Sequence, residues 1–86
     1  MFRLSFSSDA AKFFERADAP LQRKLDRCFE QLKREPRRHN NIKALKGMFA
    51  GYFRYRVGDY RVVYRIDDTT HTINVIDIAN RRDVYD

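Results

Sequence analysis

Hydrophobic and polar residues alternate most regularly in the run YFRYRVGDYRVVYRI, residues 52–66. Strict alternation predicts half-buried strands, because successive side chains point to opposite faces of a sheet. Gly58 and Asp59, with glycine first, suit a two-residue type II′ turn. A loop of odd length would put the two halves out of phase, so the sorting of the side chains independently supports this turn. We therefore predict a β-hairpin closed at Gly58-Asp59.

The two faces of this hairpin differ in chemistry. The predicted register pairs Val57 with Tyr60, Arg56 with Arg61, Tyr55 with Val62, Arg54 with Val63 and Tyr52 with Arg65. One face is apolar and is explained as core: Phe53, Tyr55, Val57, Tyr60, Val62, Tyr64 and Ile66. The other, here named the arginine face, carries Tyr52, Arg54, Arg56, Arg61, Val63 and Arg65. Like charges directly opposite each other destabilise a sheet by up to about 1 kcal/mol, so we expect something anionic to compensate.

A short strand and two helices are predicted before the hairpin. Apolar and polar residues alternate over residues 2–6, which indicates a strand with one buried face. Ser7-Ser8-Asp9 supplies the N-cap of a short amphipathic helix. A second helix is expected to begin near Asp18-Ala19-Pro20 and to end at about Glu35, because Pro36 follows. Almost no chain separates the two helices, so we expect an antiparallel helical hairpin.

The remaining segments are a loop and a last strand. Residues 36–47 form a polar basic loop with a short apolar anchor at Ile42 and Leu45. Residues 72–79, TINVIDIA, are rich in β-branched side chains and predict a strand. Isoleucine and valine occupy both parities of this strand, so we expect it to be central and covered on both sides. Asp77 in its midst needs a partner, and an arginine of the arginine face would serve.

The order of elements predicts the fold class. Strand, two helices and three strands make a two-layer α+β fold, with a short N-terminal strand, a helical hairpin and a three-stranded antiparallel meander. Residues 1–86 form one domain with one small core. We expect the helices to cover the apolar face of the hairpin, which would leave the arginine face open.

The charge is unevenly placed along the chain. The net charge is +6, and residues 36–66 hold eight basic side chains and one acidic side chain, whereas residues 67–86 hold two and five. A concentrated positive field indicates a polyanion, most often nucleic acid, or an acidic protein partner.

Other function classes find little support in the residues. Cys28 is the single cysteine, so no internal disulfide framework is expected, and its place in the apolar stripe of the second helix indicates packing rather than nucleophilic chemistry. His39 is interpreted as a surface residue or at most a phosphate contact, and His71 as an exposed residue of a turn. Two distant histidines make no metal-ligand cluster, so we expect no metal and no cofactor. Because no membrane span or signal-peptide pattern is present, we expect a cytoplasmic protein.

Two interpretations of the arginine face remain open. In the first, Asp77, Asp83 or Asp59 neutralises some of the arginines internally. In the second, the face binds phosphate, because guanidinium groups fit phosphate oxygens. Tyr52 and Tyr85 would then add stacking surfaces for bases.

Three runs of the sequence resemble a known family. LKG from Leu45, FRYRVGDYRVVYRID from Phe53 to Asp67 and RRDVY from Arg81 are similar to RelE-type toxins of the RelE/ParE toxin–antitoxin superfamily. The resemblance extends over nearly the full length and implies a RelE-like toxin domain. It also implies a ribosome-dependent endoribonuclease (an mRNA interferase) that cuts mRNA in the decoding site of the small ribosomal subunit and inhibits translation. The 2′-hydroxyl attacks the adjacent phosphate in this reaction, and no metal takes part.

The resemblance also implies roles for individual residues. Arg54 matches a phosphate contact, Arg61 the arginine that stabilises the transition state, Arg81 a second catalytic arginine that stabilises charge or acts as the acid, and Tyr85 a tyrosine that stacks on a base or assists proton transfer. Further RNA contacts are expected at Lys46, Tyr52, Arg56, Arg65 and Arg82. Tyr52 stands where well-studied members carry a lysine, which leaves the general base unassigned.

The resemblance implies partners and leaves rival functions open. The partners are a cognate antitoxin, in a complex that can be a heterotetramer, together with the ribosome and mRNA. One rival function is a ParE-like inhibitor of DNA gyrase without ribonuclease activity, for which Arg61, Arg81 and Tyr85 would be dispensable for toxicity. Another is a basic module whose only role is to bind an acidic antitoxin.

Overall fold

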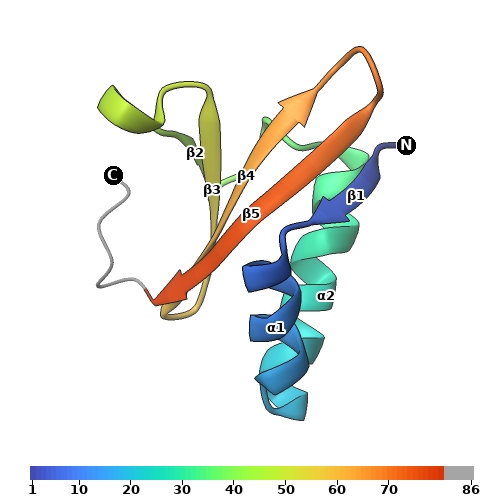
Figure 1. Ribbon diagram of the computed structural model, residues 1–86, viewed down its shortest axis with the longest axis vertical. Coiled ribbons are helices and arrows are strands. Elements are labelled where there is room, and N and C mark those ends of the chain that lie inside the picture. The colour runs from blue at the N-terminus through green and yellow to red at the C-terminus, as the bar shows by residue number, and fades with distance from the viewer. Residues whose placement is uncertain (81–86) are drawn as a thin grey trace.

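A computed structural model describes residues 1–80, which form a five-stranded sheet with two helices on one of its faces (Figure 1). The elements in chain order are β1 (Arg3–Phe6), α1 (Ser8–Arg16), α2 (Ala19–Arg34), β2 (Ile42–Ala44), a 3₁₀ turn (Gly47–Phe49), β3 (Tyr52–Val57), β4 (Tyr60–Asp67) and β5 (Thr72–Asn80). The strand order is β1-β5-β4-β3-β2. β1 runs parallel to β5, and every other pair is antiparallel. The predicted two-layer α+β fold is confirmed.

The helix boundaries follow from side chains that cap them. The Ser7 hydroxyl accepts a hydrogen bond from the Ala10 N–H at 3.1 Å, and the Asp18 carboxylate accepts one from the Leu21 N–H at 3.0 Å. Each cap satisfies a backbone donor that the first helical turn leaves unpaired. α2 ends at Arg34, two residues before Pro36. The predicted beginnings and end of the helices are therefore confirmed.

The hairpin of β3 and β4 has the predicted register, from Val57 opposite Tyr60 to Tyr52 opposite Arg65. Gly58 has a φ of +56°, whereas Asp59 has no positive φ. This combination is that of a type II′ turn, which needs glycine at its first central position. The turn therefore fixes which side chains share the arginine face.

The loop predicted over residues 36–47 contains a strand. β2 pairs with β3 through Ile42 opposite Tyr55, Lys43 opposite Arg54 and Ala44 opposite Phe53. The three-residue run is too short to show a period of its own, and its pairing depends on β3, which is distant in sequence. The apolar anchor was nevertheless correctly placed, since Leu45 is buried.

The last strand was expected to be covered on both sides, and this is wrong. β4 and β5 change register between Val63 and Tyr64: Tyr64 lies opposite Val75, and Val63 lies opposite Asp77. Ile76 is the extra residue of this β-bulge, and it shifts the alternation by one position. Ile73, Val75 and Ile78 consequently all join the core beneath the helices. The strand is internal to the sheet as predicted, between β1 and β4.

The core lies between the helices and the apolar face of the sheet. Its fully buried side chains include Leu25 and Leu32 from α2, Val62 and Tyr64 from β4, and Ile73 from β5. The Tyr64 hydroxyl donates a hydrogen bond of 2.6 Å to the Pro36 carbonyl oxygen, which ties the end of α2 to the sheet. Within residues 1–80, neither helix is long and apolar enough to cross a membrane.

Candidate nucleic-acid interface

The sheet register brings the cations of the arginine face together. Arg56 lies opposite Arg61, and Arg61 in turn lies opposite Ala79. Arg54 lies opposite Val63, and is therefore a diagonal neighbour of Arg61. Diagonal neighbours on one face are about 7–8 Å apart, a distance that two arginine side chains span easily. The register therefore places these two arginines as neighbours on one face of the sheet.

β2 contributes a cation that the sequence analysis missed. Lys43 lies directly opposite Arg54, on the same face of the sheet, and its side chain is exposed. Residues 42–45, IKAL, show no regular alternation, so the sequence carries no local signal that places Lys43 on this face. Four neighbouring positions on this face, at 43, 54, 56 and 61, are therefore cationic.

The arginine face is less open than predicted. Arg54 and Arg61 are each only 8% exposed, Arg56 is half-buried, and Arg65 is exposed. The Arg54 guanidinium folds back onto the chain before β2, where it donates a 2.7 Å hydrogen bond to the Asn41 carbonyl oxygen. The neighbours in register are short, Val63 and Ala79, so the long arginine stems can lie along the sheet surface.

Asp77 lies on the same face as the arginines. Its register position opposite Val63 makes it a diagonal neighbour of Arg61. A carboxylate there can hold a guanidinium in a fixed orientation, and Asp77 does take part in an interaction within the structure. Internal pairing of one arginine is thus compatible with the register, whereas the cations at positions 43, 54, 56 and 61 outnumber this single acid.

The other predicted site residues surround this cluster or lie outside the described residues. Tyr52 is half-buried at the first position of β3, opposite the exposed Arg65. Lys46 is exposed and immediately precedes the 3₁₀ turn. Arg81, Arg82, Tyr85 and Asp83 lie outside the described residues 1–80.

Asp77 is the acid that the register places beside Arg61, whereas the two histidines and the cysteine within residues 1–80 make other contacts. His39 is exposed, its Nδ1 accepts a 3.1 Å hydrogen bond from the Asn41 N–H, and its ring stacks on Tyr55, which belongs to the opposite face of β3. His71 is exposed in the turn before β5 and stacks on Phe2 with ring centres 3.7 Å apart. Burial raises the pKa of the Cys28 thiol, so this cysteine has a packing role and is no nucleophile.

Fold and site together define a small α+β protein that presents a cluster of cations on the sheet face opposite its helices. The sequence model of the family described as the ParE toxin of type II toxin–antitoxin systems (parDE) matches residues 3–85. The chain belongs to this toxin family, and the predicted membership of the RelE/ParE superfamily is confirmed.

Individual relatives agree with this assignment. Toxin RelG of Mycobacterium tuberculosis is 42% identical over 58 residues, which are 67% of this chain and 64% of RelG. The match therefore covers less than two thirds of that relative. The YoeB/ParE toxin from Agrobacterium tumefaciens is 26% identical, with a TM-score of 0.83 over 92% of this chain and 98% of the other. The toxin–antitoxin complex RelBE2 from M. tuberculosis contains a chain that is 30% identical, with a TM-score of 0.70. The match covers 93% of this chain and 98% of that chain.

Proposed function

We propose that this protein is a toxin that cleaves mRNA in the decoding site of the ribosome and thereby stops translation. The observation that carries the proposal is the cluster of Arg54, Arg61, Arg56 and Lys43 on one face of the sheet. The similarity to relatives named RelG and RelBE2 supports it.

The chemistry of phosphodiester cleavage fits these residues. The 2′-oxygen attacks the adjacent phosphorus, its proton leaves, and the bond to the 5′-oxygen breaks as that oxygen takes up a proton. The products are a 2′,3′-cyclic phosphate, or a 3′-phosphate after hydrolysis, and a 5′-hydroxyl. Negative charge builds on the phosphoryl oxygens in the transition state, and preorganised cations there are the strongest available help. Arg61 would stabilise this charge, and Arg54 would hold the phosphate.

Two further catalytic roles are assigned to residues near the end of the chain, and the RNA contacts are assigned to other basic residues and to a tyrosine. Arg81 is proposed as the second catalytic arginine, and Tyr85 as the residue that stacks on a base or assists proton transfer. Lys46, Tyr52, Arg56, Arg65 and Arg82 are proposed as RNA contacts. No metal is invoked, because cationic side chains supply the charge.

The small contribution expected from general acid–base catalysis explains why the ribosome would be needed to position the RNA. General acid–base catalysis contributes about 10²–10⁴-fold, and among residues 1–80 no glutamate lies on the arginine face, while His39 stacks on Tyr55 of the opposite face. The enzyme would then depend on RNA that is held with the 2′-oxygen in line with the bond that breaks. A ribosome that fixes mRNA in the decoding site supplies this geometry.

A cognate antitoxin is proposed as the protein partner. The RelBE2 structure is that of a toxin–antitoxin complex, and the net charge of +6 favours an acidic partner. The antitoxin would wrap the chain and cover basic residues, in an assembly such as a heterotetramer.

A second candidate function is inhibition of DNA gyrase. It is favoured by one observation, that the matching family model is described as ParE. On this alternative Arg61, Arg81 and Tyr85 would be dispensable for toxicity.

Induced expression without antitoxin distinguishes the two. We expect incorporation of labelled amino acids to stop within minutes, while plasmid supercoiling stays normal. Loss of supercoiling with continued protein synthesis would instead establish the gyrase function.

A further inference from the structure

A cleft separate from the cation cluster lies between α2 and the outer edge of β3. β2 pairs with β3 only as far as Tyr55, so the edge of β3 beyond it, toward Gly58, faces α2. The cleft has a volume of about 270 Å³. One water molecule occupies about 30 Å³, so there is room for a phosphate group with several waters.

The walls of this cleft carry cations and no acid. Lys24 and Arg27 come from α2, and Arg56 comes from β3; the other lining residues are Cys28, Asn41, Tyr55, Val57 and Gly58. Lys24 and Arg27 are three residues apart, so they lie on one side of the helix. Within residues 1–80 neither of them forms an ion pair. The Arg56 Nε is buried and has no hydrogen-bond partner, which is costly for a charged group.

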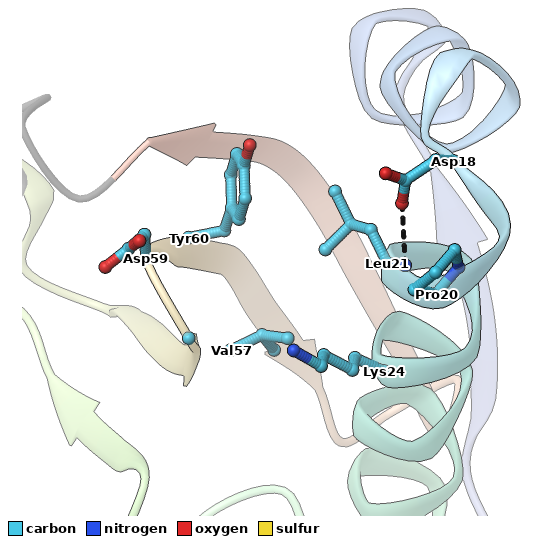
Figure 2. Close-up of a pocket in the computed structure, with 8 residues that line it drawn as sticks. Asp18, Pro20, Leu21, Lys24, Val57, Asp59 and Tyr60 are labelled. Carbon is cyan, nitrogen blue, oxygen red and sulfur yellow. Dashed lines mark hydrogen bonds between the residues drawn. The ribbon is translucent and has the colours of Figure 1, made fainter.

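The neighbouring hollow at the hairpin turn shows where this positive field ends. It shares Lys24, Val57 and Gly58 with the cleft, but it is also lined by Asp18 and Asp59. Figure 2 shows the Lys24 side chain reaching from α2 toward Val57, with Asp18 and Asp59 farther along the two walls. An anion is therefore attracted to the Arg27 end of this surface and repelled from the turn.

We propose that the cleft formed by Lys24, Arg27 and Arg56 is a second phosphate-binding site for RNA. The inference rests on the proposed function and extends it. Arg56 belongs both to the arginine face and to the cleft, so one RNA backbone can pass from the cluster around the edge of β3 to α2. The cleft would hold a phosphate that is not cleaved and so fix the orientation of the protein on its substrate.

The test compares two double variants that each lose one lysine and one arginine. Lys24→Gln with Arg27→Gln alters the cleft, whereas Arg3→Gln with Lys12→Gln removes the same charge from exposed positions on β1 and α1. Binding of a fluorescent single-stranded RNA, fully 2′-O-methylated so that it cannot be cleaved, is measured by anisotropy between 50 and 200 mM salt. The slope of log affinity against log salt changes by about 0.7 for each phosphate contact to a single strand.

We expect the cleft variant to bind about tenfold more weakly at low salt and its slope to become shallower by about 1.4. The control should keep the wild-type slope. Equal losses in both variants, or none in the cleft variant, would overturn the proposal. So would unchanged RNA binding together with weakened binding of the antitoxin, because the cleft would then serve a protein.

An independent readout is titration with inorganic phosphate followed by amide chemical shifts. Shifts that centre on Arg27, Arg56 and Gly58 support the site, and shifts confined to other residues refute it. Neither measurement depends on cleavage. A chain that fails to cut mRNA on ribosomes but shows these effects would refute the proposed function and keep the cleft.

Discussion

Arg54 and Arg61 are more than nine-tenths buried, although both are charged. A buried charge is costly unless it is hydrogen-bonded or paired, and Arg54 meets this need through the Asn41 carbonyl oxygen. A guanidinium that is held in place needs little reorganisation when charge develops on a phosphate, which is the condition for strong electrostatic stabilisation. The enclosed arginines are therefore better suited to catalysis than the exposed Arg65, which we assign to binding alone.

Tyr64→Phe tests the hydrogen bond that ties α2 to the sheet. The substitution leaves the buried Pro36 carbonyl oxygen without its donor, and we expect the free energy of unfolding to fall by about 1–3 kcal/mol. Tyr60→Phe is the matched control, because Tyr60 is half-buried and its hydroxyl makes no hydrogen bond within residues 1–80. Its effect should stay within about 0.5 kcal/mol. Urea unfolding of both variants measures the difference, and equal effects would contradict the role of the bond.

Glu35 makes stability depend on pH. The Arg37 N–H donates a hydrogen bond to its carboxylate, and this holds the pKa of Glu35 below its ordinary value despite an opposing effect of desolvation. A carboxyl with a lowered pKa stabilises the fold above its unfolded pKa, and the contribution is lost as the pH falls through the folded pKa. Glu35→Gln should therefore be less stable than wild type at pH 7, with a difference that shrinks as the pH falls below about 4. A difference that is the same at pH 7 and pH 2 would contradict this explanation.

The hairpin turn is the element on which the arginine face depends. Gly58 has a φ of +56°, and a Cβ built there meets no atom within 4 Å. The cost of Gly58→Ala is therefore one of backbone conformation, and we expect a loss of roughly 1–2 kcal/mol. D-Alanine at position 58, introduced by chemical synthesis, favours positive φ and should leave stability near wild type. Equal losses with both alanines, in thermal or urea unfolding, would show that space rather than φ is limiting.

Elements with a long local pattern could be predicted from the sequence. The caps at Ser7 and Asp18 and the hairpin register were all visible in local residue types. β2 was missed because a three-residue edge strand depends on its partner. The bulge at Ile76 was missed because apolar residues of both parities also describe a strand covered on two sides.

The site was predictable to a similar extent. Alternation in the hairpin placed Arg54, Arg56, Arg61 and Arg65 on one face, as the structure has them. Alternation gives no information about how deeply a side chain is enclosed, and so the burial of Arg54 and Arg61 was not foreseen. Lys24 and Arg27 were not predicted as site residues, because their position beside β3 depends on the packing of α2 against the sheet.

At the scale of the whole molecule, the basic charge and the lack of a histidine or glutamate on the arginine face among residues 1–80 predict that the protein depends on the ribosome to position its substrate. We expect purified protein to cleave mRNA on programmed ribosomes at least about 10²-fold faster than the same RNA free in solution, because in-line geometry is supplied by the ribosome. Gel analysis of end-labelled RNA, with and without ribosomes, measures the ratio. Efficient cleavage of free RNA would refute the mechanism.

The central claim is that Arg61 acts on the reacting phosphate, and mapping of mRNA 5′ ends on ribosomes tests it most directly. The purified wild type, Arg61→Ala and, as a control for lost charge, Arg3→Ala on the exposed β1 edge are compared, after circular dichroism has shown that each is folded. We predict that Arg61→Ala lowers the rate of cleavage by about 10²–10³-fold, while Arg3→Ala cleaves at the wild-type sites and rate. Wild-type cleavage by Arg61→Ala, or no cleavage by any of the three proteins, would contradict the account.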